Sequence, residues 1–185
     1  MEKNDVKRVV LTGAESTGKT TLAQRLAEHY GTVWTPEYVR LFVEEKGRLP
    51  EASDVEAIAR GHLAAKAALL PKARRVLFLD TDLVSSCVYN AHYFGHCPAW
   101  IVEASYARHG DLYLLAAADI PWTPDPGQRE SPEVRELLQR RFEAELARRG
   151  VPVVTVAGPL EARLRTAVAA VDRLLEVATH ARRDT

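Results

Sequence analysis

The sequence predicts an α/β fold in which a five-stranded parallel sheet is covered by helices on both faces. Strand-like and helix-like segments alternate along the 185 residues, and a glycine-rich octapeptide follows the first strand-like segment. Strands separated by helices form parallel sheets whose two faces are both covered. The length predicts a single domain over residues 1–185, with enough chain for a full hydrophobic core.

The five expected strands are short, apolar and rich in β-branched residues. The clearest are Arg8–Thr12 (RVVLT) and Arg75–Asp80 (RVLFLD), and the others cover residues 32–35, 111–116 and 152–156. Between them lie segments whose apolar residues recur at helical spacing and which end at glycine or proline. These expected helices cover residues 20–30, 38–46, 53–70, 83–93, 98–108, 132–149 and 159–177.

Capping residues mark several of the expected helix ends. Ser53 and Glu56 have the spacing of a capping box, and Ser131 is a good N-cap in front of a proline. Gly31 directly follows the first expected helix, where a left-handed glycine commonly ends a helix.

The composition limits the partners and the cellular compartment that we expect. Lys plus Arg equals Asp plus Glu, at 25 each, and a chain with no net charge is not expected to bind nucleic acid as its main partner. Cys87 and Cys97 form no metal-type cluster and are expected to be reduced thiols. No apolar run reaches the roughly 18 residues needed to span a bilayer, and the amino end has no signal peptide pattern. We therefore expect a cytoplasmic protein.

The octapeptide Gly13–Thr20 (GAESTGKT) fits the pattern G-x-x-x-x-G-K-[ST] at every fixed position. A strand-like segment precedes it and a helical segment follows, as in P-loop NTPases, so a fortuitous glycine-rich turn is the weaker interpretation. We expect Lys19 to reach the β- and γ-phosphates of ATP and the Thr20 hydroxyl to bind Mg²⁺. The expected nucleotide contacts are Gly13, Ala14, Glu15, Ser16, Thr17, Gly18, Lys19, Thr20 and Thr21.

Two carboxylates follow the third expected strand, in the sequence Asp80-Thr81-Asp82. An apolar strand would hold Asp80 rigidly, where it can orient Mg²⁺ or its waters beside the phosphates. Asp82 can reach a substrate hydroxyl, as general base or as a ribose ligand. The alternative is that both residues cap the next helix, and the sequence does not decide which of the two would act as the base.

The segment Trp34–Arg40 (WTPEYVR) follows the second expected strand. Glu37 is a candidate for binding ribose hydroxyls, and Arg40 is a candidate for binding a phosphate or carboxylate. Tyr38 or Trp34 can stack on a flat ring. The alternative is an ordinary helix start, with Glu37 in the first turn and Trp34 in the core.

A proline-rich loop, about residues 119–131, lies between the fourth expected strand and the next helix. Kinases often place a lid at such a point to exclude water from the phosphates. Arg129 is a candidate for stabilising the charge on the transferred phosphoryl group. Asp125 can pair with it or contact substrate, and Trp122 can anchor the lid or stack on a base. The alternative is a surface loop whose arginine is merely solvated.

The histidines are interpreted as structural or surface residues, and two of the tyrosines as core residues. None of the six histidines has metal-ligand spacing, and His62 lies within an expected helix. Tyr89 and Tyr93 are expected to lie in the core rather than against a substrate.

The segments GAESTGKTTL, PEYVR, FLDTDLVSSCVY, YFGHCP and PWTPDPGQR resemble the ribosylnicotinamide kinase domain of bacterial NAD-biosynthesis proteins. The resemblance extends from about Val9 to Leu174 and includes a fold like that of nucleoside and nucleotide kinases, with a lid. Some relatives read W-E-Y where this chain has Pro36-Glu37-Tyr38. The chain lacks the H-x-G-H motif of the adenylyltransferase domain found in multifunctional relatives, so a stand-alone kinase is expected.

This resemblance implies ATP-dependent phosphorylation of the ribose 5′-hydroxyl of nicotinamide riboside, giving nicotinamide mononucleotide. It assigns Gly13, Gly18, Lys19 and Thr20 to ATP and Mg²⁺, Arg129 to the lid, and Glu37, Tyr38, Arg40, Asp80 and Asp82 to the small-molecule nucleoside. The rival functions are a kinase for another nucleoside or small alcohol and a regulatory nucleotide-hydrolysing switch. The sequence contains no N-K-x-D signature of a GTPase, and it does not predict the oligomeric state.

Overall fold

The computed structural model describes residues 6–107, 109–121 and 131–180. In this part of the chain five strands form one sheet in the order β2-β3-β1-β4-β5, and each neighbouring pair is parallel. The strands are β1 (Lys7–Thr12), β2 (Trp34–Thr35), β3 (Val76–Asp80), β4 (Leu112–Ala116) and β5 (Val153–Val156). The prediction of a five-stranded parallel sheet is confirmed.

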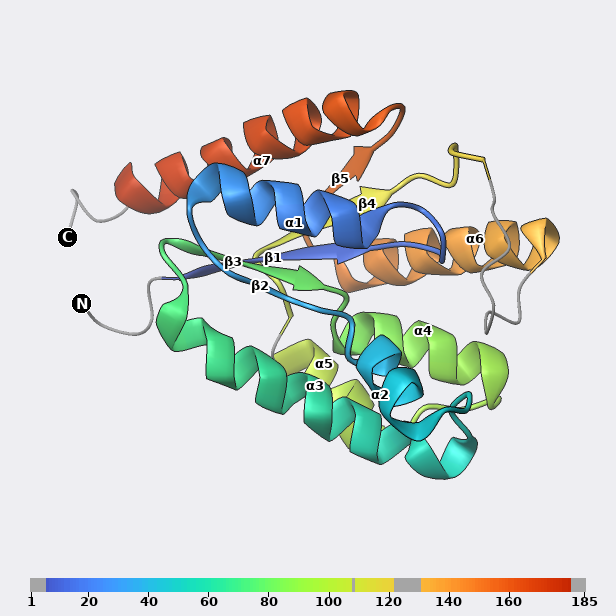
Figure 1. Cartoon of the computed structure of the whole chain (residues 1–185). Coiled ribbons are helices and arrows are strands. Elements are labelled where there is room, and N and C mark those ends of the chain that lie inside the picture. The colour runs from blue at the N-terminus through green and yellow to red at the C-terminus, as the bar shows by residue number, and fades with distance from the viewer. Residues whose placement is uncertain (1–5, 108, 122–130, 181–185) are drawn as a thin grey trace.

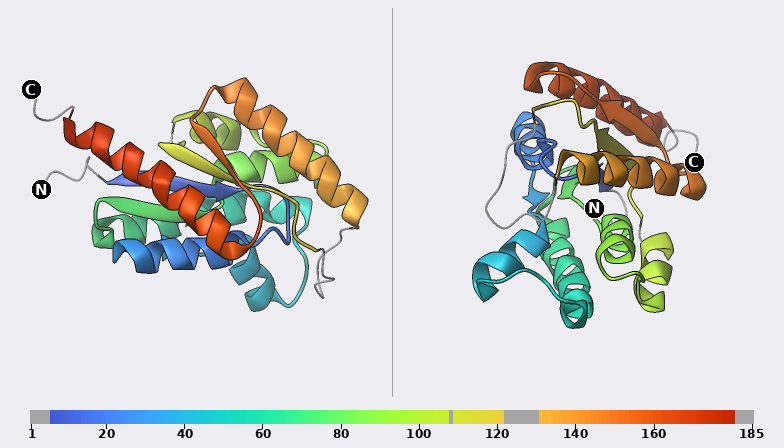
Figure 2. Two further views of the ribbon diagram at one scale, coloured as in Figure 1. Left: turned by 90° about the horizontal axis from the view of Figure 1, so that it is seen from above. Right: turned by 90° about the vertical axis from the view of Figure 1, so that its right-hand side faces the viewer.

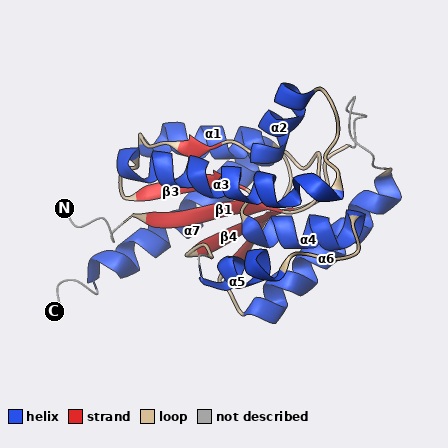
Figure 3. Cartoon of the chain, turned by 90° about the horizontal axis from the view of Figure 1, so that it is seen from below, coloured by secondary structure: helices blue, strands red, loops and turns tan. Residues whose placement is uncertain are grey.

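Helices cover both faces of this sheet (Figure 1). Helices α1 (Lys19–Tyr30) and α7 (Leu160–His180) lie on one face, and α3 (Val55–Leu69), α4 (Leu83–Tyr93) and α6 (Pro132–Arg149) lie on the other. Helix α5 (Ala99–Ala107) packs against α4 (Figure 3). Helix α2 (Tyr38–Lys46) follows the carboxyl end of β2, beside α3 (Figure 2). No helix within the described ranges is long and apolar enough to cross a membrane.

The strands send alternate side chains into two separate hydrophobic clusters. In β1, Val9 and Leu11 pack on the side of α1 and α7, whereas Val10 packs on the side of α4 and α6. All three side chains are fully buried. This alternation is the period of two expected for a strand, and burial on both faces explains why the strands read as continuous apolar runs.

The expected helix ends are confirmed in two places and wrong in one. The Ser131 hydroxyl accepts a hydrogen bond from Val134 N, and Gly31 ends α1 with φ 58°. The capping box predicted at Ser53 and Glu56 is wrong, because a short 3₁₀ turn (Ala52–Asp54) precedes α3. The capping box instead joins Glu51 and Asp54 at the start of that turn.

Asp82 forms the N-cap of α4 and is buried. Its Oδ1 accepts hydrogen bonds from Val84 N at 2.9 Å and Ser85 N at 3.3 Å. Its Oδ2 accepts a hydrogen bond of 2.7 Å from the buried hydroxyl of Tyr113 in β4, which in turn accepts one from Gly110 N. Both carboxylate oxygens therefore have partners within the protein, which favours the capping alternative for Asp82.

We expect Asp82→Ala to lower the free energy of unfolding by about 2 kcal/mol, because it removes the N-cap and leaves the Tyr113 hydroxyl without its acceptor. Asp82→Ser, which can still cap α4, should lose roughly half as much. Urea unfolding of the two variants beside the parent chain measures both values. An Asp82→Ala variant as stable as the parent would contradict this capping role.

Candidate active site

The loop between β1 and α1 contains two glycines in left-handed backbone conformations. Gly13 has φ 120° and Gly18 has φ 78°. A Cβ on Gly13 would lie only 2.7 Å from the carbonyl oxygen of Ala116, so the approach of β4 leaves room for glycine alone. A cavity of about 310 Å³ lies at the amino end of α1, lined by residues 15–21 together with Glu37 and Arg40. Its position at a helix amino end suits phosphate groups.

Lys19 is buried and folds back over this loop. Its Nζ donates to the carbonyl oxygens of Gly13 at 3.1 Å and Ala14 at 2.7 Å. The ammonium group therefore lies within the loop, beside the cavity at the amino end of α1. Two backbone carbonyls hold it there.

Side chains from two distant helices fix the shape of the loop. Gln139 of α6 accepts a hydrogen bond from Ala14 N at 3.2 Å. Arg163 of α7 is buried, donates to the carbonyl oxygen of Thr17 at 3.1 Å, and pairs with Asp119 in the segment after β4. The phosphate loop is therefore held rigidly against the sheet and both neighbouring helices.

Thr20 and Asp80 bring two oxygen ligands together beside Lys19. The Thr20 hydroxyl donates a hydrogen bond of 2.6 Å to Asp80 Oδ2, while the fully buried Oδ1 of Asp80 has no hydrogen-bond partner in the part of the chain that the structure describes. Burial raises the pKa of the Asp80 carboxyl, and the nearby Lys19 ammonium opposes that rise.

Hard oxygen donors next to a phosphate cavity fit Mg²⁺, which protein sites bind with one or two carboxylates plus water and phosphate oxygens. The buried Oδ1 of Asp80, without a hydrogen-bond partner among the described residues, is the further observation that fits a cation at this position. Within the described residues no three His, Cys, Asp or Glu side chains form a metal cluster. A site completed by phosphate oxygens does not need one.

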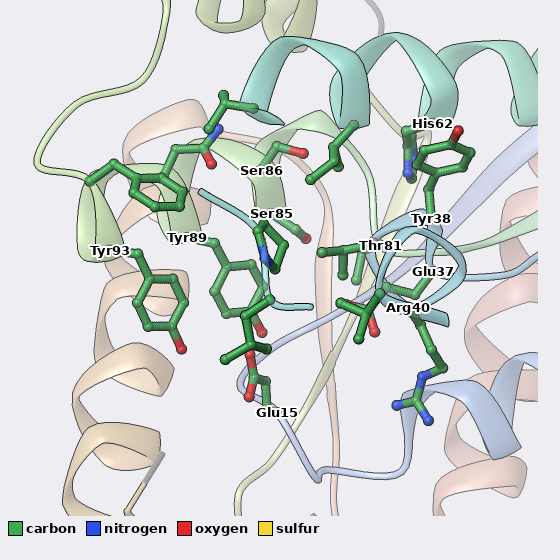
Figure 4. A pocket seen from close by; sticks show the side chains of 18 of the residues that line it. Glu15, Glu37, Tyr38, Arg40, His62, Thr81, Ser85, Ser86, Tyr89 and Tyr93 are labelled. Atoms are coloured by element: carbon green, nitrogen blue, oxygen red, sulfur yellow. The ribbon is translucent and has the colours of Figure 1, made fainter. Parts of the chain in front are cut away.

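A second cavity of about 360 Å³, here called the acceptor cavity, lies between α2, α3 and α4 (Figure 4). It shares Glu15, Glu37 and Arg40 with the phosphate cavity. The two cavities therefore meet at one wall, which is the arrangement required for transfer of a group from a ligand in one to a ligand in the other.

Glu37 lies in this shared wall, between the end of β2 and the start of α2. Burial raises the pKa of its carboxyl to about 7, assisted by the charges of Asp80 and Glu15 and opposed by Lys19 and Arg40. At neutral pH this carboxyl is therefore present in both protonation states. A group with a pKa near the working pH is suited to moving a proton.

The acceptor cavity combines aromatic rings with an excess of carboxylates. Its aromatic lining residues are Tyr38, Tyr89, Tyr93 and Phe94. Its charged residues are three carboxylates (Glu15, Glu37 and Glu44) and one arginine, Arg40. Rings and negative charge together favour a flat cationic ligand.

The structure brings some of the predicted substrate residues together and separates others. Glu37, Tyr38 and Arg40 line the acceptor cavity. Trp34 is partly buried against the cluster on the side of α1 and α7, and it does not line the cavity. Asp82 caps α4, and neither cavity includes it. The predicted lid residues Trp122, Asp125 and Arg129 lie outside the described residues.

Several lining residues were not predicted from the sequence. The sequence favours a structural or surface role for His62 and a core position for Tyr89 and Tyr93, but in the structure all three line the acceptor cavity. The sequence does contain a signal for the lining residues of α4. Polar and aromatic residues recur there at helical spacing directly after Asp80-Thr81-Asp82. These residues are Ser85, Ser86, Tyr89, Asn90 and Tyr93. His62 has no comparable local signal.

Comparison with known proteins gives relatives over most of the chain. A family model described as "AAA domain" matches residues 8–163. The trifunctional NAD biosynthesis/regulator proteins NadR of Escherichia coli (strain K12) and of Salmonella typhimurium are each 31% identical over 124 residues. Each alignment covers 65% of this chain but 30% of the relative, so the chain spans less than a third of the length of these curated relatives.

Solved structures show the same fold. Two crystal structures of NadR protein, one in complex with NR and one with NAD and AMP-PNP, match with TM-scores of 0.75 and 0.74 at 26% identity. Each match covers 94% of this chain and 51% of the NadR chain. Thymidylate kinase from Ehrlichia chaffeensis matches with a TM-score of 0.60 at 16% identity, covering 89% of this chain and 98% of that one.

These matches agree with the strand order and the phosphate loop described above. The chain has the P-loop kinase fold, is homologous to NadR, and belongs to the family described as "AAA domain".

Proposed function

We propose that this chain is an ATP-dependent kinase that phosphorylates the ribose 5′-hydroxyl of nicotinamide riboside, giving nicotinamide mononucleotide. The observation that carries the proposal is the wall that the phosphate and acceptor cavities share, formed by Glu15, Glu37 and Arg40. The unit proposed is the single domain of residues 1–185, with a lid at about residues 119–131 that contributes Arg129. ATP is the donor and a nucleoside the acceptor.

On the donor side, the phosphate loop and Lys19 would bind the β- and γ-phosphates of ATP. The ammonium group already lies within the loop, so it needs only to exchange its carbonyl partners for phosphate oxygens. Thr20 and Asp80 would hold Mg²⁺, which when bound neutralises negative charge on the phosphates. Arg40 reaches both cavities and is suited to a phosphate at their junction.

On the acceptor side, the proposal of nicotinamide riboside has two supports. One is the solved structure of NadR protein in complex with NR, which has 26% sequence identity to this chain. The other is the lining of the acceptor cavity, because the pyridinium ring of nicotinamide riboside is flat and carries a positive charge. Tyrosine faces and a carboxylate excess attract such a ring more strongly than a neutral base.

Glu37 is the proposed general base. Asp80 is engaged by Thr20, and Asp82 caps α4, whereas the Glu37 carboxyl lies where the two cavities meet. It would accept the proton of the 5′-hydroxyl as that oxygen bonds to the γ-phosphorus and ADP leaves. The 5′ oxygen gains the phosphoryl group, and Glu37 later releases the proton to water.

We expect nicotinamide riboside to stimulate the release of ADP from ATP, and Lys19→Met to reduce that turnover by about 100-fold or more, because the charge on the transferred group loses its stabilisation. A coupled ADP assay across a nucleoside panel measures the rates, and phosphorus NMR identifies the product. Turnover with a different nucleoside alone would contradict the proposal that nicotinamide riboside is the acceptor. Slow ATP hydrolysis that no nucleoside stimulates would contradict the proposed kinase activity and favour a nucleotide-dependent switch.

Activity should depend on pH through Glu37. A carboxyl with a raised pKa of about 7 keeps its proton below that pH, so kcat/KM should fall as the pH drops below 7 and level off above it. Glu37→Gln should lower kcat by about 100-fold or more and remove this acidic limb. Protonation of ATP itself affects the parent and Glu37→Gln equally, so a difference between their pH profiles reports on Glu37 and not on the substrate. An acidic limb of the same size in Glu37→Gln would rule out Glu37 as the base.

A further inference from the structure

Helix α3 contributes one polar side chain, His62, to the lining of the acceptor cavity. His62 is 5% exposed and lines the cavity, and its Nε2 has no hydrogen-bond partner within the described residues. A buried polar atom left unpaired destabilises the fold unless something satisfies it. An apolar side chain of similar size would fill this position of α3 without that cost, so the unpaired nitrogen points to a ligand.

The residue before His62 supports the same conclusion. Gly61 lies in the interior of α3, where glycine is less favourable than alanine by roughly 0.5–1 kcal/mol. A Cβ at this position would overlap the ring of Tyr38, so the glycine gives that ring its place against the helix. Figure 4 shows Tyr38 and His62 at the same end of the cavity. Helix α3 therefore packs against the ring of Tyr38 at Gly61 and places the Nε2 atom of His62 at the same end of the cavity.

The imidazole is suited to an uncharged partner. Burial lowers the pKa of His62, with a further decrease from Lys66 and an opposing increase from Asp82, so the ring is neutral at pH 7. A neutral imidazole has one N–H donor and one acceptor nitrogen. It can therefore bond either to the carbonyl oxygen or to the amide N–H of a carboxamide, without adding charge to the cavity.

We propose that His62 is a specificity-determining residue whose Nε2 hydrogen-bonds an uncharged polar substituent on the base of the acceptor nucleoside. This inference rests on the proposed kinase function, and for nicotinamide riboside the substituent is the ring carboxamide. Tyr38 contacts the ring of the base, while His62 hydrogen-bonds the substituent attached to that ring. The carboxylates of the cavity attract a cationic ring but do not distinguish one pyridinium from another, so His62 would supply that selection.

The test compares nicotinamide riboside with pyridinium riboside, which lacks the carboxamide, in the parent chain, His62→Leu and His62→Gln. The parent should prefer nicotinamide riboside in kcat/KM by about tenfold or more. His62→Leu should raise the KM for nicotinamide riboside by about tenfold, leave kcat near the parent value, and leave pyridinium riboside unaffected. His62→Gln, which keeps a donor and an acceptor, should retain part of the preference. The exposed His29 of α1 supplies a matched control, His29→Leu, which should behave as the parent.

Thermal unfolding separates recognition from a structural role. Because Nε2 has no hydrogen-bond partner among the residues that the structure describes, His62→Leu should unfold at the same temperature as the parent or higher. A lower unfolding temperature, with equal losses for both ribosides, would mean that His62 is structural and would overturn the inference. If His62→Leu keeps the parent's preference for nicotinamide riboside over pyridinium riboside, the inference about His62 is wrong, but the proposed kinase function still stands. A parent chain that phosphorylates no nucleoside would overturn both proposals.

Discussion

The hydrogen bond between Thr20 and Asp80 joins the two parts of the chain from which the site is built. It is 2.6 Å long and links the first turn of α1 to the last residue of β3. Asp80 lies opposite Leu11 in the parallel register of β1 and β3, so the sheet places the carboxylate next to the phosphate loop. Thr20 lines the phosphate cavity, and Thr81, the residue after Asp80, lines the acceptor cavity.

The fold was predictable because its determinants are local. Each buried strand is an apolar run that ends at a turn, as β1 does at Gly13, and alternate residues of β1 reach opposite cores. The left-handed Gly31 and the Ser131 N-cap act within one helical turn of the boundaries they set. The wrong prediction at Ser53 also has a local cause, because Glu51 and Asp54 form a capping box two residues earlier in the chain.

The site was predictable only where one segment carries it. The phosphate loop holds its own lysine and hydroxyl, so Lys19 and Thr20 follow from a motif. The sequence left Asp82 open as either a substrate contact or a helix cap. The capping role is favoured by the buried hydroxyl of Tyr113, which donates to Asp82 from β4, a separate strand. His62 faces the cavity only because α3 packs beside α2, and a contact between two helices leaves no pattern in either.

The aromatic lining of the acceptor cavity does not include Trp34, which lies two residues before Pro36. Trp34 is the only tryptophan near this segment, but its side chain packs with the cluster on the α1 and α7 face, opposite the cavity. The strand therefore directs this ring away from any ligand held by α2, α3 and α4. The rings that remain for stacking come from helices, namely Tyr38 on α2 with Tyr89 and Tyr93 on α4, whose rings are parallel with centroids 6.2 Å apart. In the proposed function, recognition of the base would therefore depend on how α2, α3 and α4 pack together, and much less on the strand that precedes them.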